Sequence, residues 1–416
     1  MTTIRPLLPA HFATALGSAP GVGEDLEAYL RAGGYRPCDP AELLERITRS
    51  GLRGRGGAGF PAALKLATVR DARGEAVVVA NGEEGEPGSV KDRWLLRARP
   101  HLVLDGLARA AAITGARAGY VYVSDPDAAD RVRAALKERG AQSQVRVVLT
   151  EPAYVAGEET AVVRRINGGP ALPTAKPPRP YERGVDGAPT LVANVETLAR
   201  IALLAASAED PGPPGPADAY LLTLSAGDRP AVLTEAVAHT TLDELARLLG
   251  TERPRAVLTG GLSGGLLGPG SGLPVERDAL ASASASLGCG AIRFLGPDEC
   301  PVAVVADSLA YLSGQSARQC GVCVSGTSAL RDTVAGLTAG RVDDERIARL
   351  TRWSSTLPGR GACGLLDAAA RLVASLLRVF PALVEAHRGR PCAPVKVSGQ
   401  HRLRVPVPEV SVRLPA

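Results

Sequence analysis

The sequence predicts a multidomain α/β protein: a helix-covered parallel sheet, then a small mixed module, then a helical bundle. Three observations predict this order. Between residues 51 and 207, short apolar runs alternate with helical patterns. A Pro/Gly-rich linker then occupies 208–218, and helical periodicity prevails from 301 onward. The length of 416 residues is enough for two or three domains.

The individual elements follow from local patterns. In the first part we expect strands at 75–81, 119–124 and 144–150 and helices at 101–114 and 125–140. The middle part, 218–296, has the pattern of a ββαββ module with a helix near 241–250 and a flexible glycine-rich loop at 260–272. The last part is predicted to contain helices at 301–314, 325–338, 342–354 and 364–386.

The predicted domains are therefore as follows: a helical lead-in (1–50), an α/β domain (51–207), a mixed module (218–296), a helical bundle (300–390) and a peripheral tail (391–416).

Composition excludes several classes of protein. Hydrophobic residues make up 45% and charged residues 22%, which is the balance of an ordinary globular protein. The net charge of +5 is scattered rather than striped, so nucleic-acid binding is not expected. We see no apolar run of the roughly 18 residues that span a bilayer, and the N-terminus is a poor signal peptide. We therefore expect a cytoplasmic protein, either free or peripheral to a membrane complex.

Seven cysteines in a long chain of this kind argue against a disulfide framework and leave room for a metal or redox site.

A glycine-rich segment, GLRGRGGAGFP at 51–61, is the first candidate for ligand binding. Gly54, Gly56, Gly57 and Gly59 permit close backbone approach, and their N–H groups can surround a phosphate. Arg55 and Lys65 add positive charge nearby. Taken alone, the pattern fits a flexible loop at least as well.

Four further motifs follow in order. NGEEGEPG (81–88) places three carboxylates where a strand ends, and carboxylates accept hydrogen bonds well from ribose hydroxyls and amides. AYVAGEET (153–160) follows another strand, KPPRP covers 176–180, and NVET (194–197) has ordinary helix-capping chemistry. Each motif alone could be a turn, a solvated acidic loop or a helix start.

Together and in this order, the five motifs resemble the NADH-oxidising FMN subunit of respiratory complex I and its relatives, the diaphorase subunits of NAD-linked hydrogenases and formate dehydrogenases. The family patterns are GRGGAGFP with a following Lys, NADExEPGxxKDR, AYxxGEETAL, KPPFP and NNVET. This sequence has GRGGAGFP with Lys65, NGEEGEPGSVKDR, AYVAGEETAV, KPPRP and ANVET. The resemblance covers about 45–375.

The resemblance implies a Rossmann-like FMN domain, a ubiquitin-like SLBB β-grasp module and a helical bundle that carries a [4Fe-4S] motif. It implies hydride transfer from NADH or NADPH to flavin N5, then one-electron transfer to an iron–sulfur cluster, a ferredoxin-like protein or a quinone. A thioredoxin-like [2Fe-2S] subunit or a ferredoxin is the implied partner. The flavin carries the chemistry, so no catalytic side chain is required.

Family roles carry over to matching positions. Glu86 and Glu159 are implied to orient the nicotinamide, while Glu83 replaces the usual Asp and Ala193 replaces the first Asn of NNVET. The residues implied to bind FMN or the nucleotide are Arg55, Gly56, Gly57, Gly59, Phe60, Lys65, Asn81, Glu83, Glu86, Tyr154, Gly157, Glu158, Glu159, Lys176, Asn194 and Thr197.

Two aromatic positions of the family's adenine site are changed here. Phe60 is kept, but Thr68 and Arg179 stand where phenylalanines are usual. An arginine can stack on adenine or meet a 2′-phosphate. We therefore hypothesise a nucleotide preference that is weakened or shifted toward NADPH.

The cluster motif departs further. The family pattern is SCGxCxPCREG with a later cysteine, whereas this chain has SARQCGVCVSG at 316–326 and a later Cys363. Cys320, Cys323 and Cys363 match ligands, and Ala317 replaces the first one. A cluster normally takes four thiolates. The alternatives are a cluster with a borrowed ligand (Cys289 and Cys300 are candidates), a three-iron cluster, or none.

Three functional alternatives to the complete electron-transfer subunit remain. One is an FMN diaphorase without a working cluster, and another is a non-catalytic interaction subunit that kept the fold. The third is a simple phosphate-binding module, which leaves the cysteine and glutamate motifs unexplained.

Overall fold

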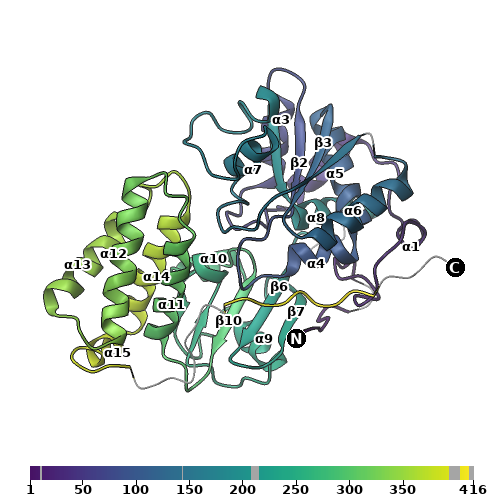
Figure 1. Ribbon diagram of the computed structural model, residues 1–416. Coiled ribbons are helices and arrows are strands. Elements are labelled where there is room, and N and C mark those ends of the chain that lie inside the picture. The colour runs from purple at the N-terminus through teal and green to yellow at the C-terminus, as the bar shows by residue number, and fades with distance from the viewer. Residues whose placement is uncertain (10–11, 143, 208–214, 393–402, 412–416) are drawn as a thin grey trace.

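The computed structural model describes residues 1–416 except 10–11, 143, 208–214, 393–402 and 412–416 (Figure 1). Its first sheet has the order β4-β3-β2-β5, with every neighbouring pair parallel. The valine-rich strand β2 is buried on both faces, as expected for a parallel sheet between helices. The strands are β2 (Val77–Asn81), β3 (Ala118–Val123), β4 (Val145–Leu149) and β5 (Thr190–Asn194).

Six helices surround this sheet: α3 (Ala62–Arg70), α4 (Lys91–Ala98), α5 (Pro100–Thr114), α6 (Pro126–Arg139), α7 (Glu159–Ile166) and α8 (Val195–Ala206). Helices α5 and α8 pack against each other at very short range. A Cβ added to Gly106 of α5 would lie 2.0 Å from the backbone oxygen of Leu198 in α8. The α5–α8 contact therefore depends on the missing side chain at Gly106.

The N-terminal lead-in contains helices α1 (Leu26–Arg31) and α2 (Pro40–Arg49), as expected. It also contains a strand that we did not expect. β1 (Thr2–Ile4) pairs in parallel with β7 (Ala231–Val237), more than 200 residues later in the chain. Because this pairing is remote in sequence, no local pattern indicates it.

The second sheet is six-stranded and mixed, in the order β1-β7-β6-β10-β8-β9. Helix α9 (Leu242–Leu248) packs on it and begins with a capping box between Thr241 and Glu244. A second helix, α10 (Arg277–Ser282), precedes the last strand. The remaining strands are β6 (Ala219–Ala226), β7 (Ala231–Val237), β8 (Ala256–Leu258), β9 (Leu266–Leu267) and β10 (Ala291–Leu295).

The loop at 260–272 is more ordered than the expected flexible segment. It contains a 3-10 turn, η2 (Gly261–Ser263), and strand β9, and it packs on helix α14 (Leu365–Val379). Leu262 and Leu266 are buried there. Of the predicted linker 208–218, residues 208–214 lie outside the described residues.

The C-terminal part is the expected helical bundle (Figure 1). Its helices are α11 (Pro301–Gly314), α12 (Gly321–Thr338), α13 (Asp344–Thr356), α14 (Leu365–Val379) and α15 (Pro381–Ala386). The helix expected over 364–386 is divided at Phe380, because the following proline cannot continue the α14 hydrogen-bond ladder.

We expected the tail to be peripheral, but its described residues pack against the rest of the protein. Residues 403–411 run along the boundary between the second sheet and helix α4 toward the N-terminal lead-in (Figure 1). Leu403 and Val405 are buried, and the Val405 N–H donates to the Pro87 oxygen at 2.9 Å. Apolar side chains between the prolines explain the packing, but which surface they cover depends on the tertiary fold.

A buried ionic network joins the α/β domain to the second sheet. Arg200 of α8 is completely buried and pairs with Glu196 of the same helix and with Glu235 of β7. Glu235 also accepts hydrogen bonds from the Ala15 and Leu16 N–H groups at 3.0 Å each. The charges are therefore compensated, as burial requires.

Candidate functional site

The carboxyl ends of β2 and β5 form the base of the site. Asn81 and Asn194 end these strands and are directly paired in the sheet. The glycine-rich loop at 51–61 passes beside them, so that a Cβ on Gly56 would lie 3.3 Å from Asn194 Cβ. The Arg55 N–H donates to Thr197 Oγ1 at 2.9 Å. The first and fifth motifs therefore meet at this edge, where ligands of parallel α/β sheets bind.

Buried charges hold Asn194 in place. Its Nδ2 donates to Asp92 at 2.7 Å, and Lys91 Nζ lies 2.6 Å from Asp92 Oδ1 and 3.1 Å from Glu196 Oε2. Our sequence reasoning gave Lys91 and Asp92 no role. Their burial cannot be predicted from sequence, where two adjacent charges look like an ordinary helix surface.

The third motif reaches the same edge. Asn81 Nδ2 donates to the Gly157 oxygen at 2.8 Å, although the two residues are 76 positions apart. Glu158 caps helix α7 by accepting from the Thr160 N–H at 2.8 Å. Lys176, from the fourth motif, binds Glu158 Oε1 at 2.6 Å.

Lys65 lies on α3, the helix that follows the glycine-rich loop, and it contacts both β5 and α7. Its Nζ donates to the Val192 oxygen at 2.8 Å and lies 3.3 Å from Glu159 Oε2. Glu159 in turn lies 3.8 Å from Lys176 Nζ. Two ammonium groups and two adjacent carboxylates thus share one partly exposed surface. All five motifs are brought together here.

Glu83 is a buried carboxyl with an unused acceptor. Its side chain is largely desolvated, Oε1 lies 3.4 Å from the Ala153 N–H, and Oε2 has no hydrogen-bond partner. Burial raises the pKa of Glu83 from 4.5 to about 7, although contacts with the Ser124 side chain and the Ala153 N–H oppose part of this shift. A buried polar atom without a partner is costly unless a ligand satisfies it. The hydroxyl and amide donors of a flavin nucleotide fit this acceptor.

Glu86 and Tyr154 face other parts of the protein. Glu86 Oε2 accepts from the Leu262 N–H at 3.0 Å, and burial raises the Glu86 pKa to about 7. Tyr154 makes an edge contact with Tyr311 of the bundle, with ring centroids 6.3 Å apart. Both residues attach the acidic loop and the segment before α7 to the second sheet and the bundle.

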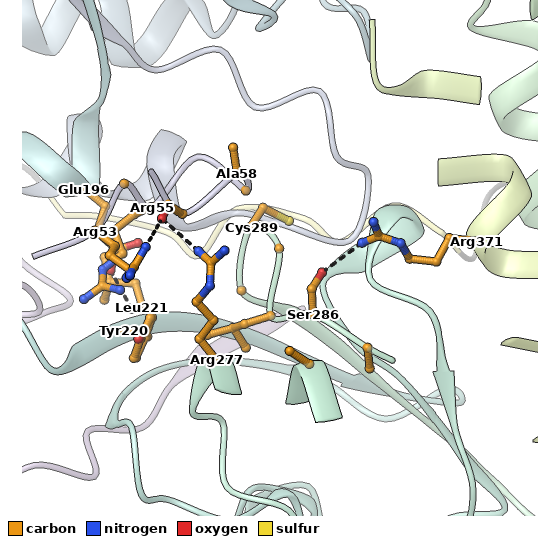
Figure 2. A pocket seen from close by; sticks show the side chains of 18 of the residues that line it. Arg53, Arg55, Ala58, Glu196, Tyr220, Leu221, Arg277, Ser286, Cys289 and Arg371 are labelled. Carbon is orange, nitrogen blue, oxygen red and sulfur yellow. Dashed lines mark hydrogen bonds between the residues drawn. The ribbon is translucent and has the colours of Figure 1, made fainter. Parts of the chain in front are cut away.

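The opposite face of the glycine-rich loop borders a cavity of about 520 Å³ (Figure 2). Gly57 and Gly59 line it, and Arg53 and Arg277 both donate to the Gly59 oxygen, at 3.0 and 2.8 Å. Arg371 completes a basic lining from the bundle side. Arg277 and Arg371 belong to none of the five motifs, so the sequence did not predict them here.

The Arg55 side chain lines this same cavity and does not lie beside Lys65. Its guanidinium stacks on the Tyr220 ring at 3.8 Å from the centroid and donates to the Ala217 oxygen. Burial lowers its pKa, partly offset by Tyr220 and Glu196. Arg55 therefore attaches the glycine-rich loop to the second sheet through its side chain.

The three positions of the expected adenine site differ in exposure. Phe60 is 49% exposed and Arg179 is exposed as well. Thr68 is half-buried and donates to the Leu64 oxygen at 2.8 Å. An aromatic face and a cation are thus available to a ligand.

The three cysteines of the cluster motif converge. Cys320, Cys323 and Cys363 line one small cavity of about 20 Å³ together with Ser316 and Ala317. Burial raises the pKa of the Cys323 and Cys363 thiols. The donor set comprises three thiols, with Ala317 at the fourth position, and therefore does not supply the four thiolates of an ordinary [4Fe-4S] site.

Neither substitute cysteine lines this cavity. Cys289 lines the cavity beneath the glycine-rich loop. Cys300 precedes α11, whereas the cluster motif follows the other end of that helix. Fourteen residues of helix separate the two ends by roughly 21 Å. Cys300 is therefore excluded as a fourth ligand.

Comparisons with known proteins agree with this arrangement. A family model described as "Nuo51 FMN-binding domain" matches residues 47–203, and another described as "NADH-ubiquinone oxidoreductase-F iron-sulfur binding region" matches residues 303–387. An NADH-quinone oxidoreductase subunit of Rhizobium meliloti is 30% identical over 401 residues, covering 88% of this chain and 94% of that protein. This chain belongs to the family of FMN-binding NADH-quinone oxidoreductase subunits.

This chain is also similar to subunits of hydrogenases. NAD-reducing hydrogenase HoxS subunit alpha of Cupriavidus necator is 30% identical, over 83% of this chain and 60% of that protein. NADP-reducing hydrogenase subunit HndC of Solidesulfovibrio fructosivorans is 28% identical, over 88% and 81%. A crystal structure of an NAD⁺-reducing [NiFe]-hydrogenase in the H2-reduced state matches with a TM-score of 0.76 at 28% identity, over 88% and 67%.

These matches confirm the resemblance and the α/β fold class. They also confirm that this NADH-quinone oxidoreductase family member has an FMN-binding domain and the iron–sulfur region of its family, the latter with Ala317 at one ligand position. Within the described ranges, no helix is both long and apolar enough to cross a membrane.

Proposed function

We propose that this chain binds FMN at the carboxyl edge of the four-stranded sheet and oxidises NADH or NADPH there. The observation that carries the proposal is the convergence of the five motifs at this edge, with the unpartnered acceptor Oε2 of Glu83 beside them. FMN, when bound, accepts a hydride and releases electrons one at a time. The residues of this chain bind and orient the reactants.

We propose distinct roles for these residues. Gly56 and Gly57 admit the ligand close to the backbone, and Gly59 keeps the loop in its turn with a φ of 61°. Lys65 and Lys176 supply positive charge to an anionic ligand. The remaining polar contacts to FMN come from Asn81, Glu83, Gly157, Glu158, Asn194 and Thr197.

Glu159 is the residue we propose to orient the nicotinamide, because it lies at the edge between Lys65 and Lys176. Glu86 already accepts a hydrogen bond from Leu262, so we assign it and Tyr154 to positioning the loop that carries Glu83. Arg55 holds the glycine-rich loop, and Phe60 offers an aromatic face to the nucleotide.

A lysine replacement tests the FMN site. Lys65→Met removes the ammonium but keeps an unbranched side chain, and Lys137→Met is a matched control at an exposed position on α6. A hydrogen bond to a charged group is worth about 1.5–3 kcal/mol, so we expect Lys65→Met to weaken FMN binding about tenfold to a hundredfold. Flavin fluorescence titration of the apoprotein measures it. Equal affinities for the two variants would refute the site.

The reductant is a separate question. We propose that the exposed Arg179 shifts the preference toward NADPH, because a guanidinium can bind a 2′-phosphate. Stopped-flow flavin reduction with both nucleotides tests this, with Arg179→Phe as the comparison. A strong preference of the unaltered protein for NADH would refute it.

We also propose the electron outlet and the setting. The relatives are named as subunits, which supports a partner protein, and we propose a thioredoxin-like [2Fe-2S] subunit or a ferredoxin. All seven cysteines are free, which supports a reducing compartment such as the cytoplasm. Co-purification of a [2Fe-2S] protein with the tagged chain tests the partner.

We retain the predicted domain organisation as a proposal: lead-in 1–50, FMN domain 51–207, SLBB-like module 218–296, bundle 300–390 and tail 391–416. The buried contacts of 403–411 support treating the tail as part of the folded unit.

The three-cysteine motif favours a second candidate, an FMN diaphorase that uses no complete four-thiolate cluster. Iron and sulfide analysis with EPR of anaerobically purified protein distinguishes the two. Colourless protein that takes up no flavin would instead indicate a non-catalytic interaction subunit.

A further inference from the structure

Three side chains of the types that bind metal ions meet at the end of the bundle opposite the cluster motif. The ligand atoms of Cys300, His387 and Cys392 all lie within 4.8 Å of one another. His387 Nε2 is 3.5 Å from Cys300 Sγ and 3.2 Å from Cys392 Sγ. Cys300 and His387 are buried, and Cys392 is half-buried. Two soft sulfurs thus face one imidazole nitrogen inside the protein.

The spacing is that of ligands around a small tetrahedral ion. Zn–S bonds of about 2.3 Å and Zn–N bonds of about 2.0 Å place a sulfur and a nitrogen about 3.5 Å apart and two sulfurs about 3.8 Å apart. The two nitrogen–sulfur distances match this separation within 0.3 Å. A direct disulfide between Cys300 and Cys392 would leave His387 unexplained.

The orientation of the imidazole supports the same interpretation. His387 Nδ1 lies 2.7 Å from the Leu383 oxygen, one helical turn earlier in α15. Nδ1 must carry the proton to donate to this carbonyl, which leaves the Nε2 lone pair facing the two sulfurs. Metal-binding histidines are commonly oriented by such a backbone contact.

The location separates this site from the cluster motif. Cys320 immediately precedes α12, and the Cys392 N–H donates to the Thr338 oxygen at the other end of that helix at 2.8 Å. Eighteen helical residues span roughly 27 Å. Cys300 and Cys392 also lie outside the segment 303–387 that matches the family's iron–sulfur region.

We propose that Cys300, His387 and Cys392 bind a zinc ion, with water as the fourth ligand. Binding exchanges the two thiol protons for one Zn²⁺, with no change of oxidation state. The ion would join the start of α11, the end of α15 and the segment that follows α15, which itself contacts the end of α12 through the Thr338 oxygen. A structural role for the bundle follows, because the three ligands come from segments that are far apart in the sequence.

Metal analysis of the full-length protein tests the proposal. We expect about one zinc per chain after purification, or after dialysis against Zn²⁺ following chelation. His387→Ala and Cys392→Ala should each lower zinc affinity at least a hundredfold. Cys38→Ala, in the N-terminal part, is the matched control and should keep the zinc, and Cys363→Ala should keep it while altering iron content.

Cobalt provides a readout that does not depend on stability. Co²⁺ bound in place of Zn²⁺ should show sulfur-to-cobalt charge transfer in the unaltered protein and in Cys38→Ala, but not in Cys392→Ala. Three results would overturn the proposal: no zinc above the level of Cys392→Ala, zinc lost with Cys363 instead, or a Cys300–Cys392 disulfide in mass spectra of protein purified under reducing conditions.

Discussion

Glu83 provides a quantitative test of the site, because its carboxyl is buried with one oxygen unpartnered. Burial raises its pKa from 4.5 to about 7 in the folded protein. One pKa unit corresponds to 1.36 kcal/mol, so the ionised form destabilises the apoprotein by roughly 3 kcal/mol. Replacing Glu83 by Gln removes the charge and preserves the shape of the side chain.

The pH dependence has a definite sign. Between about pH 4.5 and 7 the folded chain binds more protons at Glu83 than the unfolded chain, so stability falls as pH rises through this window. At about pH 8 we expect Glu83→Gln to be more stable than the unaltered apoprotein by up to roughly 3 kcal/mol. At about pH 4.5 the two should be nearly equal. Glu86, whose pKa is raised likewise, adds a slope that both proteins share.

Urea unfolding of the apoprotein at a series of pH values measures this difference. Glu252→Gln, at an exposed turn, is the control and should leave the profile unchanged. If Glu83→Gln were no more stable than the unaltered protein at about pH 8, the carboxylate would have a partner in solution, and the reasoning would be refuted. Weaker FMN binding by the same variant would further support contact with the ligand.

Three further predictions concern the framework. Arg200→Met should destabilise the protein by about 3–5 kcal/mol in urea unfolding, because Glu235 then remains buried without a counter-charge; Arg200→Lys should recover part of the loss. Gly106→Ala should cost about 1–3 kcal/mol, because its Cβ would meet the Leu198 backbone at 2.0 Å, and an unchanged thermal midpoint would contradict that packing. Ala317→Cys should raise the iron and sulfide content toward four per chain, whereas unchanged iron would show that the missing thiol is not what limits the cluster.

Much of the α/β domain is predictable from sequence because its signals are local. The apolar runs at 75–81, 119–124 and 144–150 became β2, β3 and β4, and the helices over 101–114 and 125–140 became α5 and α6. The short strand at 190–194 was not predicted, since its last residue, Asn194, looks like the cap of the following helix.

What escaped prediction depends on contacts between distant residues. Strand β1 exists only by pairing with β7, and the glycine-rich loop at 260–272 is ordered by packing on α14. For the same reason the motif that predicts Glu86 at the nicotinamide does not show that Glu86 Oε2 accepts a hydrogen bond from the Leu262 N–H. The motif gives its position in the chain, and only the fold gives the direction of its side chain.

The cysteines include both a group that the sequence predicted and a group that it did not. The resemblance to the family's cluster motif placed Cys320, Cys323 and Cys363 in one group, and the structure brings them to one cavity. Cys300 was a candidate substitute ligand and Cys392 had no assigned role, yet these two meet His387 at the opposite end of the bundle. No local spacing connects residues 300 and 392.

Anaerobic titration of the FMN-loaded protein with NADH and with NADPH, followed by flavin absorbance, tests the central claim most directly. We expect at least one nucleotide to bleach the bound flavin with about one reductant per FMN, and Lys65→Met to lower flavin occupancy while Lys137→Met does not. Protein that retains FMN but is bleached by neither nucleotide, or that retains no FMN at all, would contradict it.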